Sequence, residues 1–152
     1  MKGRFAVAGL SLSAIGLLTI AKWEGFSDHA YIPVPGDVPT IGFGSTEGVR
    51  MGDTITVPKA LERLMRDVGV AESAIGRCVK VPLSQGEYDA FTSFAFNVGG
   101  ENFCTSTLVK KLNAGDYEGA CKELERWVFV QKQRVQGLAN RRKDEFRLCT
   151  DE

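Results

Sequence analysis

The sequence predicts an α+β fold with a mainly helical large lobe and a small N-terminal β-hairpin lobe. Apolar residues after Pro58 recur at three- and four-residue spacing, as on the buried face of a helix. Residues 23–46, in contrast, contain several prolines and glycines that interrupt helices. This stretch ends in TIGFGST, whose alternation and glycines suit a tight β-ribbon. Together these patterns place the ribbon before the helices in the chain.

The helices can be placed by their start and stop signals. Ser84-Gln85-Gly86-Glu87 has the form of a capping box, and Gly99-Gly100 supplies a C-terminal stop. Pro82 is expected to close the preceding long helix, which links the two lobes. The expected helices cover residues 57–81, 85–98, 107–113, 116–127 and 138–149, with an irregular segment at 128–137.

Length and charge limit the class of protein. A chain of 152 residues with 43% hydrophobic residues suits one compact domain. The formal net charge is zero, so no overall field would draw the chain onto nucleic acid, and no nucleic-acid partner is expected. Basic residues do gather late in the chain, where solvated helix faces are expected and attraction of an anionic polymer is the alternative: Arg126, Lys132, Arg134, Arg141, Arg142, Lys143 and Arg147.

The N-terminus resembles a secretory signal. Lys2 and Arg4 precede the uncharged residues 5–21, which as a helix would span roughly 26 Å against a bilayer core of about 30 Å. Many of these residues are Gly, Ala or Ser, which hold a segment only weakly in lipid. Three fates are open: a cleaved signal peptide, a permanent anchor, or a segment that inserts, leaves the membrane and packs as a helix in the folded enzyme.

Glu24 is the candidate catalytic residue. Its neighbours Trp23 and Phe26 are expected to bury it partly, which disfavours the charged form of a carboxyl group. A carboxylic acid that stays protonated near neutrality suits general acid catalysis. The single histidine, His29, has no cluster of Cys or carboxylate residues at ligand spacing, so neither a metal site nor a cofactor is expected.

These motifs resemble the phage-type lysozymes, glycoside hydrolases that act as endolysins. The landmarks that occur in family order are Glu24-Gly25, the PTIGFG of residues 39–44, the FNVG of residues 96–99, and Asn140-Arg141-Arg142. The resemblance implies a lysozyme-like catalytic domain over residues 23–152. It also implies hydrolysis of the β-1,4 bond between N-acetylmuramic acid and N-acetylglucosamine in peptidoglycan, for host cell lysis. The alternatives are a lytic transglycosylase and a non-catalytic wall-binding protein.

The resemblance assigns roles to single residues. Glu24 matches the acid that protonates the glycosidic oxygen, and Thr40 matches the threonine that positions the attacking water. Where the family has a catalytic aspartate, this chain has Pro33 or Val34, which cannot ionise. We expect Asp37 to supply that carboxylate, with a turn residue bonding its own backbone as the alternative.

Two further positions follow from the same resemblance. Arg141 matches an arginine that pairs with the general acid from behind, with a solvated surface charge as the alternative. Asn97, on the expected floor of the cleft, is the candidate sugar contact. Asp28 is a weaker candidate carboxylate, expected to be a solvated helix-end residue.

The family includes endolysins of the signal-arrest-release type, and residues 1–22 resemble their signal-anchor segment. This resemblance favours the third fate for the N-terminus: a tethered, inactive protein in the host inner membrane that is later released to the periplasm. The expected partners of this monomer are peptidoglycan and, transiently, the bacterial inner membrane.

Four cysteines, an even number without metal-ligand spacing, allow buried free thiols or disulfides. An exported protein favours disulfides, and three pairings are possible. We favour Cys78 with Cys104 and Cys121 with Cys149, because each would tie a helix to the next element but one. The sequence around Cys78 and Cys104 also resembles family members that carry both of these cysteines.

Overall fold

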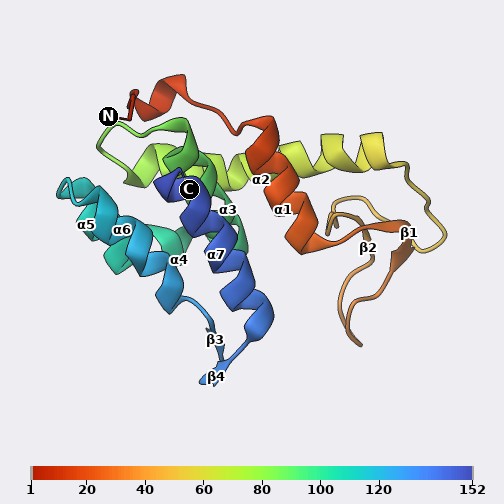
Figure 1. Ribbon diagram of the computed structural model, residues 1–152. Helices are drawn as coiled ribbons and strands as arrows, with labels where there is room; N and C mark the ends of the chain where they lie inside the picture. Colours follow the sequence, from red (N-terminus) through yellow and green to blue (C-terminus); the bar gives the residue numbers. More distant parts are fainter. Residues whose placement is uncertain (1, 152) are drawn as a thin grey trace.

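The computed structural model describes residues 2–151, which form two lobes joined by a long helix (Figure 1). The predicted α+β architecture is confirmed, with two small antiparallel sheets among the helices. The α-helices are α1 (Ala14–Glu24), α2 (Val57–Cys78), α3 (Gln85–Val98), α4 (Gly100–Cys104), α5 (Thr107–Asn113), α6 (Tyr117–Glu123) and α7 (Gln136–Thr150). Two 3-10 turns, η1 (Val7–Gly9) and η2 (Leu124–Arg126), and four strands, β1 (Ser27–Tyr31), β2 (Thr40–Gly42), β3 (Phe129–Val130) and β4 (Gln133–Arg134), complete the order.

Helix α3 lies at the centre of the large lobe. It begins with the predicted capping box, in which the Ser84 hydroxyl accepts from the Glu87 N–H and the Glu87 carboxylate accepts from the Ser84 N–H. It ends at Gly99, whose φ of 90° is open to glycine at low cost. Phe91 and Phe94 of α3 are fully buried in the main core. Helices α2 and α7 pack against α3, so the core fixes their mutual orientation.

Helix α2 links the lobes, as predicted, although it ends at Cys78 rather than at Pro82. Figure 1 shows it running from the hairpin side of the molecule into the large lobe. Its buried residues follow the helical period: Ala60, Leu64, Val68, Ala71, Ala74 and Ile75. Leu64 and Val68 form a second small core with Ile20 and Ala21 of α1. Helix α1 is thereby held beside α2.

The small lobe consists of the β1–β2 hairpin and the loops around it. Strands β1 and β2 pair antiparallel, with Ser27 opposite Gly42 and Tyr31 opposite Thr40. Ala30, Ile41 and Val49 form its own buried cluster. The loop of residues 32–39 between the strands is almost wholly exposed, and its prolines prevent it from continuing the ladder.

The expectation that residues 5–21 pack as one helix is wrong for the first half of the segment. Phe5 pairs with Leu83 in a β-bridge, and α1 begins only at Ala14. The backbone before α1 finds other partners: the N–H of Leu12 donates to Glu72 and that of Ser13 donates to Asp89. None of the helices among residues 2–151 combines the length and the apolar character needed to cross a bilayer.

The segment expected to be irregular, residues 128–137, contains a second hairpin, β3–β4. Its turn residues Gln131 and Lys132 have φ angles of 48° and 66°. Such angles match the two-residue hairpin turn that Asn and Gly usually occupy. Because neither residue is typical of that turn, the sequence did not reveal the hairpin.

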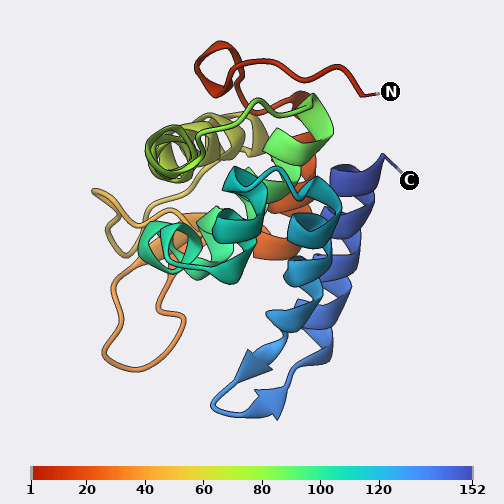
Figure 2. The same ribbon diagram turned by 90° about the vertical axis from the view of Figure 1, so that its left-hand side faces the viewer.

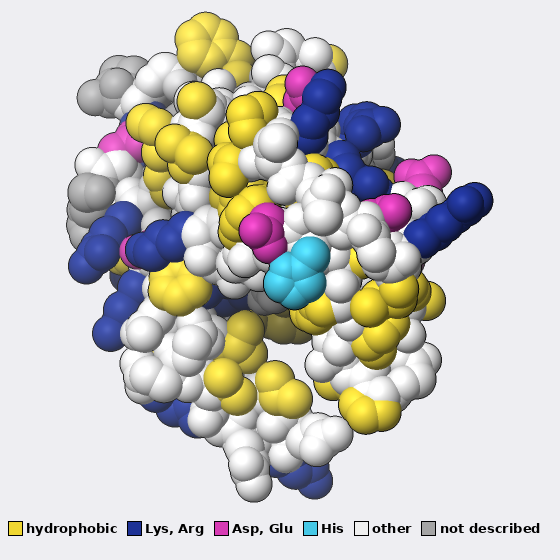
Figure 3. Space-filling model, turned by 90° about the vertical axis from the view of Figure 1, so that its right-hand side faces the viewer, with side chains coloured by type: hydrophobic (Ala, Val, Ile, Leu, Met, Phe, Trp, Pro, Cys, Tyr) yellow, Lys and Arg dark blue, Asp and Glu magenta, His cyan; other side chains and the backbone are white. Residues whose placement is uncertain are grey.

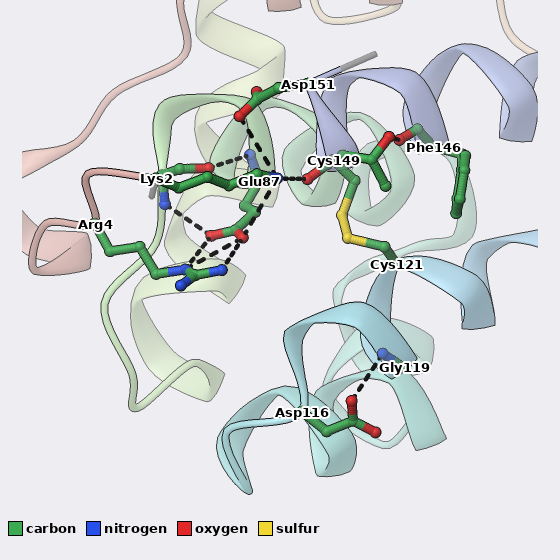
Figure 4. The surroundings of a disulfide bond; sticks show 11 residues. Lys2, Arg4, Glu87, Asp116, Gly119, Cys121, Phe146, Cys149 and Asp151 are labelled. Carbon is green, nitrogen blue, oxygen red and sulfur yellow. Dashed lines mark hydrogen bonds and ion pairs between the residues drawn. A yellow bond between two sulfur atoms is a disulfide. The ribbon is translucent and has the colours of Figure 1, made fainter.

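Both favoured disulfides are confirmed: Cys78 bonds Cys104, and Cys121 bonds Cys149. The first joins the end of α2 to α4, and the second joins α6 to α7. Figure 4 shows the second beside an ionic cluster in which Lys2 and Arg4 of the N-terminal segment reach Glu87. The N-terminal segment therefore contacts the large lobe next to a covalent crosslink.

Candidate active site

Glu24 is the last residue of α1, and the ends of that helix fix where it lies. The Ser13 hydroxyl caps the N-terminus of α1 by accepting from the Gly16 N–H. Gly25 then leaves the helix with a φ of 72°, while its N–H still donates to the Ala21 carbonyl. The chain turns at this glycine into β1, so Glu24 stands at the junction of the two lobes.

Arg141 of α7 holds the Glu24 carboxylate, as the resemblance implied. The Arg141 Nη1 donates to Glu24 Oε1 at 3.0 Å. The guanidinium is buried, with 5% of the side chain exposed, whereas Glu24 keeps 25%. Of the two readings, a solvated surface charge is therefore wrong for Arg141.

The β-ribbon faces the other carboxylate oxygen. A Cβ atom built on Gly44 would lie 3.7 Å from Glu24 Oε2. The Glu24 carboxyl group therefore lies between the guanidinium of α7 and the backbone that follows β2. A side-chain atom at position 44 would therefore be in van der Waals contact with the carboxylate.

Glu24 is partly buried, as expected, and its two aromatic neighbours in the sequence each have a further partner. Trp23 directs its indole Nε1–H to Asp144 at 3.0 Å, and Phe26 is exposed and packs against Phe43. The expectation from these aromatic neighbours did not include the direct ionic partner of Glu24, which is the buried guanidinium of Arg141.

Thr40 begins β2 and is buried, with 6% of its surface exposed. Its hydroxyl donates to the Val38 carbonyl at 3.1 Å. The lone pairs of the oxygen remain free to accept a hydrogen bond from water.

Asp37 lies in the exposed loop before β2. Its carboxylate accepts from the Val38 N–H at 2.9 Å, and its own N–H donates to the Val34 carbonyl. These contacts are those of a turn residue bonding its own backbone. Asp28, the weaker candidate, is also exposed and contacts His29.

The surface is hollowed between two projecting parts of the molecule (Figure 3). In Figures 1 and 2 the loop between β1 and β2 and the β3–β4 hairpin project to the same side of the molecule, with open space between their tips. The loop contributes exposed apolar side chains to this side, namely Ile32, Val34 and Val38, and the hairpin contributes Phe129 and Val130.

Behind Glu24, α7 carries a buried ionic network that the sequence analysis missed. Glu145 is fully buried and accepts from Arg141 Nε at 3.4 Å and from the Ser93 hydroxyl at 2.8 Å. Its second oxygen lies 3.0 Å from Arg142 Nη1. Positions 141, 142 and 145 stand four and three residues apart, a spacing that could have revealed these pairs. Five residues of the basic cluster are exposed as expected, but these two arginines are buried.

Burial and charge act against each other in this network. Burial raises the pKa of Glu145, and the two guanidinium groups oppose that rise. Burial likewise lowers the pKa of Arg142, which Glu145 counters. Arg142 also donates to the amide oxygen of Asn97. Asn97 itself is exposed at the end of α3, so its amide NH₂ is available to a ligand.

Comparison with known proteins identifies the family. Residues 21–145 match the family described as phage lysozyme. An endolysin of Acyrthosiphon pisum secondary endosymbiont phage 1 is 39% identical over 90% of this chain and 95% of its own length. A SAR-endolysin of Pseudomonas phage phiKMV is 36% identical over 95% of this chain and 89% of its own length.

Solved structures show the same fold. The crystal structure of a mutant P22 lysozyme superposes with a TM-score of 0.85 at 34% identity, covering 93% of this chain and 99% of its own. The match to the family includes Glu24, the β1–β2 hairpin and α7 as far as Glu145. On sequence and fold together, the chain belongs to the phage lysozyme family.

Proposed function

We propose that Glu24 is the general acid with which this peptidoglycan-hydrolysing endolysin cleaves the bond between N-acetylmuramic acid and N-acetylglucosamine. The observation that supports this role is the position of its carboxyl group between the buried Arg141 and the backbone at Gly44. Glu24 also remains partly exposed, as a group that must reach a substrate requires. Protonation of the glycosidic oxygen by a carboxylic acid, with an oxocarbenium-like sugar forming as the bond breaks, is the established route for such hydrolysis.

Thr40 is the proposed holder of the attacking water. Because its hydroxyl hydrogen is engaged by the Val38 carbonyl, its oxygen can only accept from that water. The water would then direct a lone pair towards the sugar. A hydroxyl orients water but is too weak a base to take its proton at neutral pH, so a carboxylate must complete the step.

Asp37 is the proposed source of that second carboxylate. It stands next to Val38, whose carbonyl accepts from the Thr40 hydroxyl, so the two side chains start from the same short stretch of chain. Asn97 is the proposed sugar contact, with Arg142 fixing its amide oxygen and leaving its NH₂ group free to donate.

Substitution of the acid tests this function. Glu24→Gln keeps the size of the side chain and removes the transferable proton, so turnover of purified cell walls should be lost while the thermal unfolding midpoint stays near that of the parent. Asp37→Asn, measured beside it, should lower kcat by at least about 100-fold if Asp37 completes the water's activation. Appreciable activity of Glu24→Gln would contradict the assignment.

Ordinary reducing ends in the product, rather than 1,6-anhydromuramic ends, are expected for hydrolysis.

We further propose that residues 5–21 first enter the host inner membrane, and that their release to the periplasm produces the monomeric active enzyme. Their uncharged, glycine- and alanine-rich composition and the SAR-endolysin relative support this history. Assembly of the active site also requires this release. Glu24 is the last residue of α1, so it cannot reach Arg141 while α1 lies in lipid.

Two glycines offer a matched test of this release. Gly9→Leu adds apolar surface where a Cβ meets open space in the folded enzyme. It should retain the protein in the membrane fraction while leaving detergent-extracted, refolded enzyme active. Gly16→Leu adds the same apolar group where a Cβ would lie 2.8 Å from the Asp89 carboxyl carbon, so it should impair the refolded enzyme as well. Release of Gly9→Leu at the parent's rate would count against the proposal.

A further inference from the structure

We propose that Glu145 is a positioning residue for the general acid, acting through Arg141. The inference rests on the proposed role of Glu24. Beyond that role, we infer that the buried carboxylate of Glu145 sets the direction of the Arg141 side chain and the charge balance around Glu24 without contacting the substrate.

The three nitrogens of the Arg141 guanidinium meet three different acceptors. Nη1 donates to Glu24 at 3.0 Å, Nε donates to Glu145 at 3.4 Å, and Nη2 donates to the Ser93 carbonyl at 3.5 Å. Because the guanidinium is planar and rigid, the contacts of Nε and Nη2 determine where Nη1 points. Of these two acceptors, only Glu145 is charged.

Glu145 is itself held in place. It is fully buried, and the Ser93 hydroxyl on α3 donates to Oε1, the same oxygen that receives Arg141. Its other oxygen faces Arg142 without a hydrogen bond of good geometry. An unsatisfied buried charge pair is a poor source of stability, and apolar residues of similar volume often replace such pairs without loss. The cost of keeping these charges points to a role outside stability.

The charges form a balanced set. Two guanidinium groups, Arg141 and Arg142, face two carboxylates, Glu24 and Glu145. When Glu24 takes up a proton for catalysis, Glu145 is the one anion left to offset both cations. Removing its charge would make the protonated form of Glu24 harder to reach, because two uncompensated cations favour the ionised form.

Other charged groups surround α1, and the test leaves them unchanged. They are Asp144 on α7, which accepts from Lys22 and Trp23; Asp67 on α2, which accepts from Ser45 of the ribbon; and, at the far end of α1, Asp89 on α3 and Glu72 on α2. A shift that follows substitution at position 145 alone can therefore be assigned to the network on α7.

The test is the pH profile of Glu145→Gln on purified peptidoglycan. Glutamine keeps the size and an acceptor oxygen, so Arg141 can stay in place while the charge is lost. Activity that depends on a general acid falls as the pH rises, because the acid loses its proton. We expect this falling, alkaline limb of the pH–activity profile to lie about one pH unit lower in Glu145→Gln than in the parent. Glu87→Gln is the matched control: Glu87 is as buried and is also ion-paired, but with Arg4, away from Glu24. It should lower the unfolding temperature without moving the limb.

An unmoved alkaline limb in folded Glu145→Gln would overturn the inference. If the single variant does not fold, Glu145→Asp takes its place, because aspartate keeps the charge but shortens the reach to Arg141. Its limb should match that of the parent while kcat falls at least about tenfold, since Arg141 is no longer held in position. A kcat equal to that of the parent would overturn the inference. Failure of the proposed function is distinguishable, because Glu24→Gln would then remain active.

Discussion

Arg4 and Glu87 form a two-pronged ion pair across 83 residues of sequence, with Arg4 Nη2 2.8 Å and Nε 3.0 Å from the carboxylate oxygens of Glu87. Figure 4 shows this pair with Lys2 between the N-terminal segment, α3 and the end of α7. Glu87 is buried and also caps α3. The segment that precedes α1 is therefore fastened to the helix at the centre of the large lobe.

Loss of Arg4 should destabilise the enzyme in a pH-dependent way. Burial raises the pKa of Glu87, but hydrogen bonds from Arg4 and Ser84 outweigh it and hold the pKa below its ordinary value of 4.5. Since the folded pKa is depressed, this stabilisation is present above the ordinary value and is lost as the pH falls through the folded one. We expect Arg4→Met to lower the free energy of unfolding by about 2 kcal/mol at pH 7, measured by denaturant titration, and by less near pH 3.

Lys59→Met provides the matched control for Arg4→Met. Lys59 pairs with Glu62 at 3.1 Å, but both side chains are exposed. Such a pair should contribute less than about 1 kcal/mol. An equal loss for Arg4→Met at pH 7 and pH 3 would refute the role given to Glu87.

Gly44→Ala should impair catalysis more than it impairs folding. The new methyl group would lie 3.7 Å from Glu24 Oε2, in the space that a substrate oxygen must approach. The backbone φ of 88° also adds strain of roughly 1–2 kcal/mol. Gly48→Ala separates the two effects, because Gly48 has a φ of 67° and nothing within 4 Å of its Cβ position. The two variants should lose similar stability in thermal unfolding, and only Gly44→Ala should lose wall hydrolysis; equal activities would show that this space is not used.

The sequence could predict the parts of the site that depend on local signals. The capping box at Ser84 and the glycine stop at Gly99 depend on neighbouring residues, and both were predicted correctly. The pairing of Arg141 with Glu24 came from the family resemblance, since its two residues lie 117 positions apart. Glu145 escaped notice because it looks like one more surface charge until the packing of α3 against α7 buries it.

The N-terminal segment was harder to predict for a different reason. Residues 5–13 are apolar enough to favour a helix, yet the folded lobe offers them competing partners in Leu83, Glu72 and Asp89. Hydrogen bonds to residues so distant in the sequence cannot be predicted from the local pattern of apolar residues in the segment.

Reduction of the disulfides should lower the stability of the large lobe. The bridges close segments of 26 and 28 residues, for which loop-closure entropy gives about 3.5 kcal/mol each. Cys121–Cys149 should matter more for activity, because it fixes the end of α7, the helix that carries Arg141. We expect Cys121→Ala with Cys149→Ala to lose more wall hydrolysis at about 37 °C than Cys78→Ala with Cys104→Ala. The reverse order would mean that α7 is held by its core contacts alone.

The turn of the β3–β4 hairpin offers a route to a more stable enzyme. Gln131 and Lys132 both adopt positive φ angles, a conformation that costs residues with a Cβ roughly 1–2 kcal/mol each. Asn followed by Gly suits this turn best, because Gly has no such cost and Asn tolerates the left-handed region. Gln131→Asn with Lys132→Gly should therefore raise the unfolding midpoint by a few degrees in calorimetry, since the gain outweighs the added freedom of glycine in the unfolded chain. As a control, Lys110→Asn with Lys111→Gly places the same two residues inside helix α5. This variant should have a lower unfolding midpoint than the parent, because glycine inside a helix is unfavourable. A hairpin variant that is also less stable than the parent would show that the Gln131 and Lys132 side chains stabilise the turn in a way that its backbone angles do not reveal.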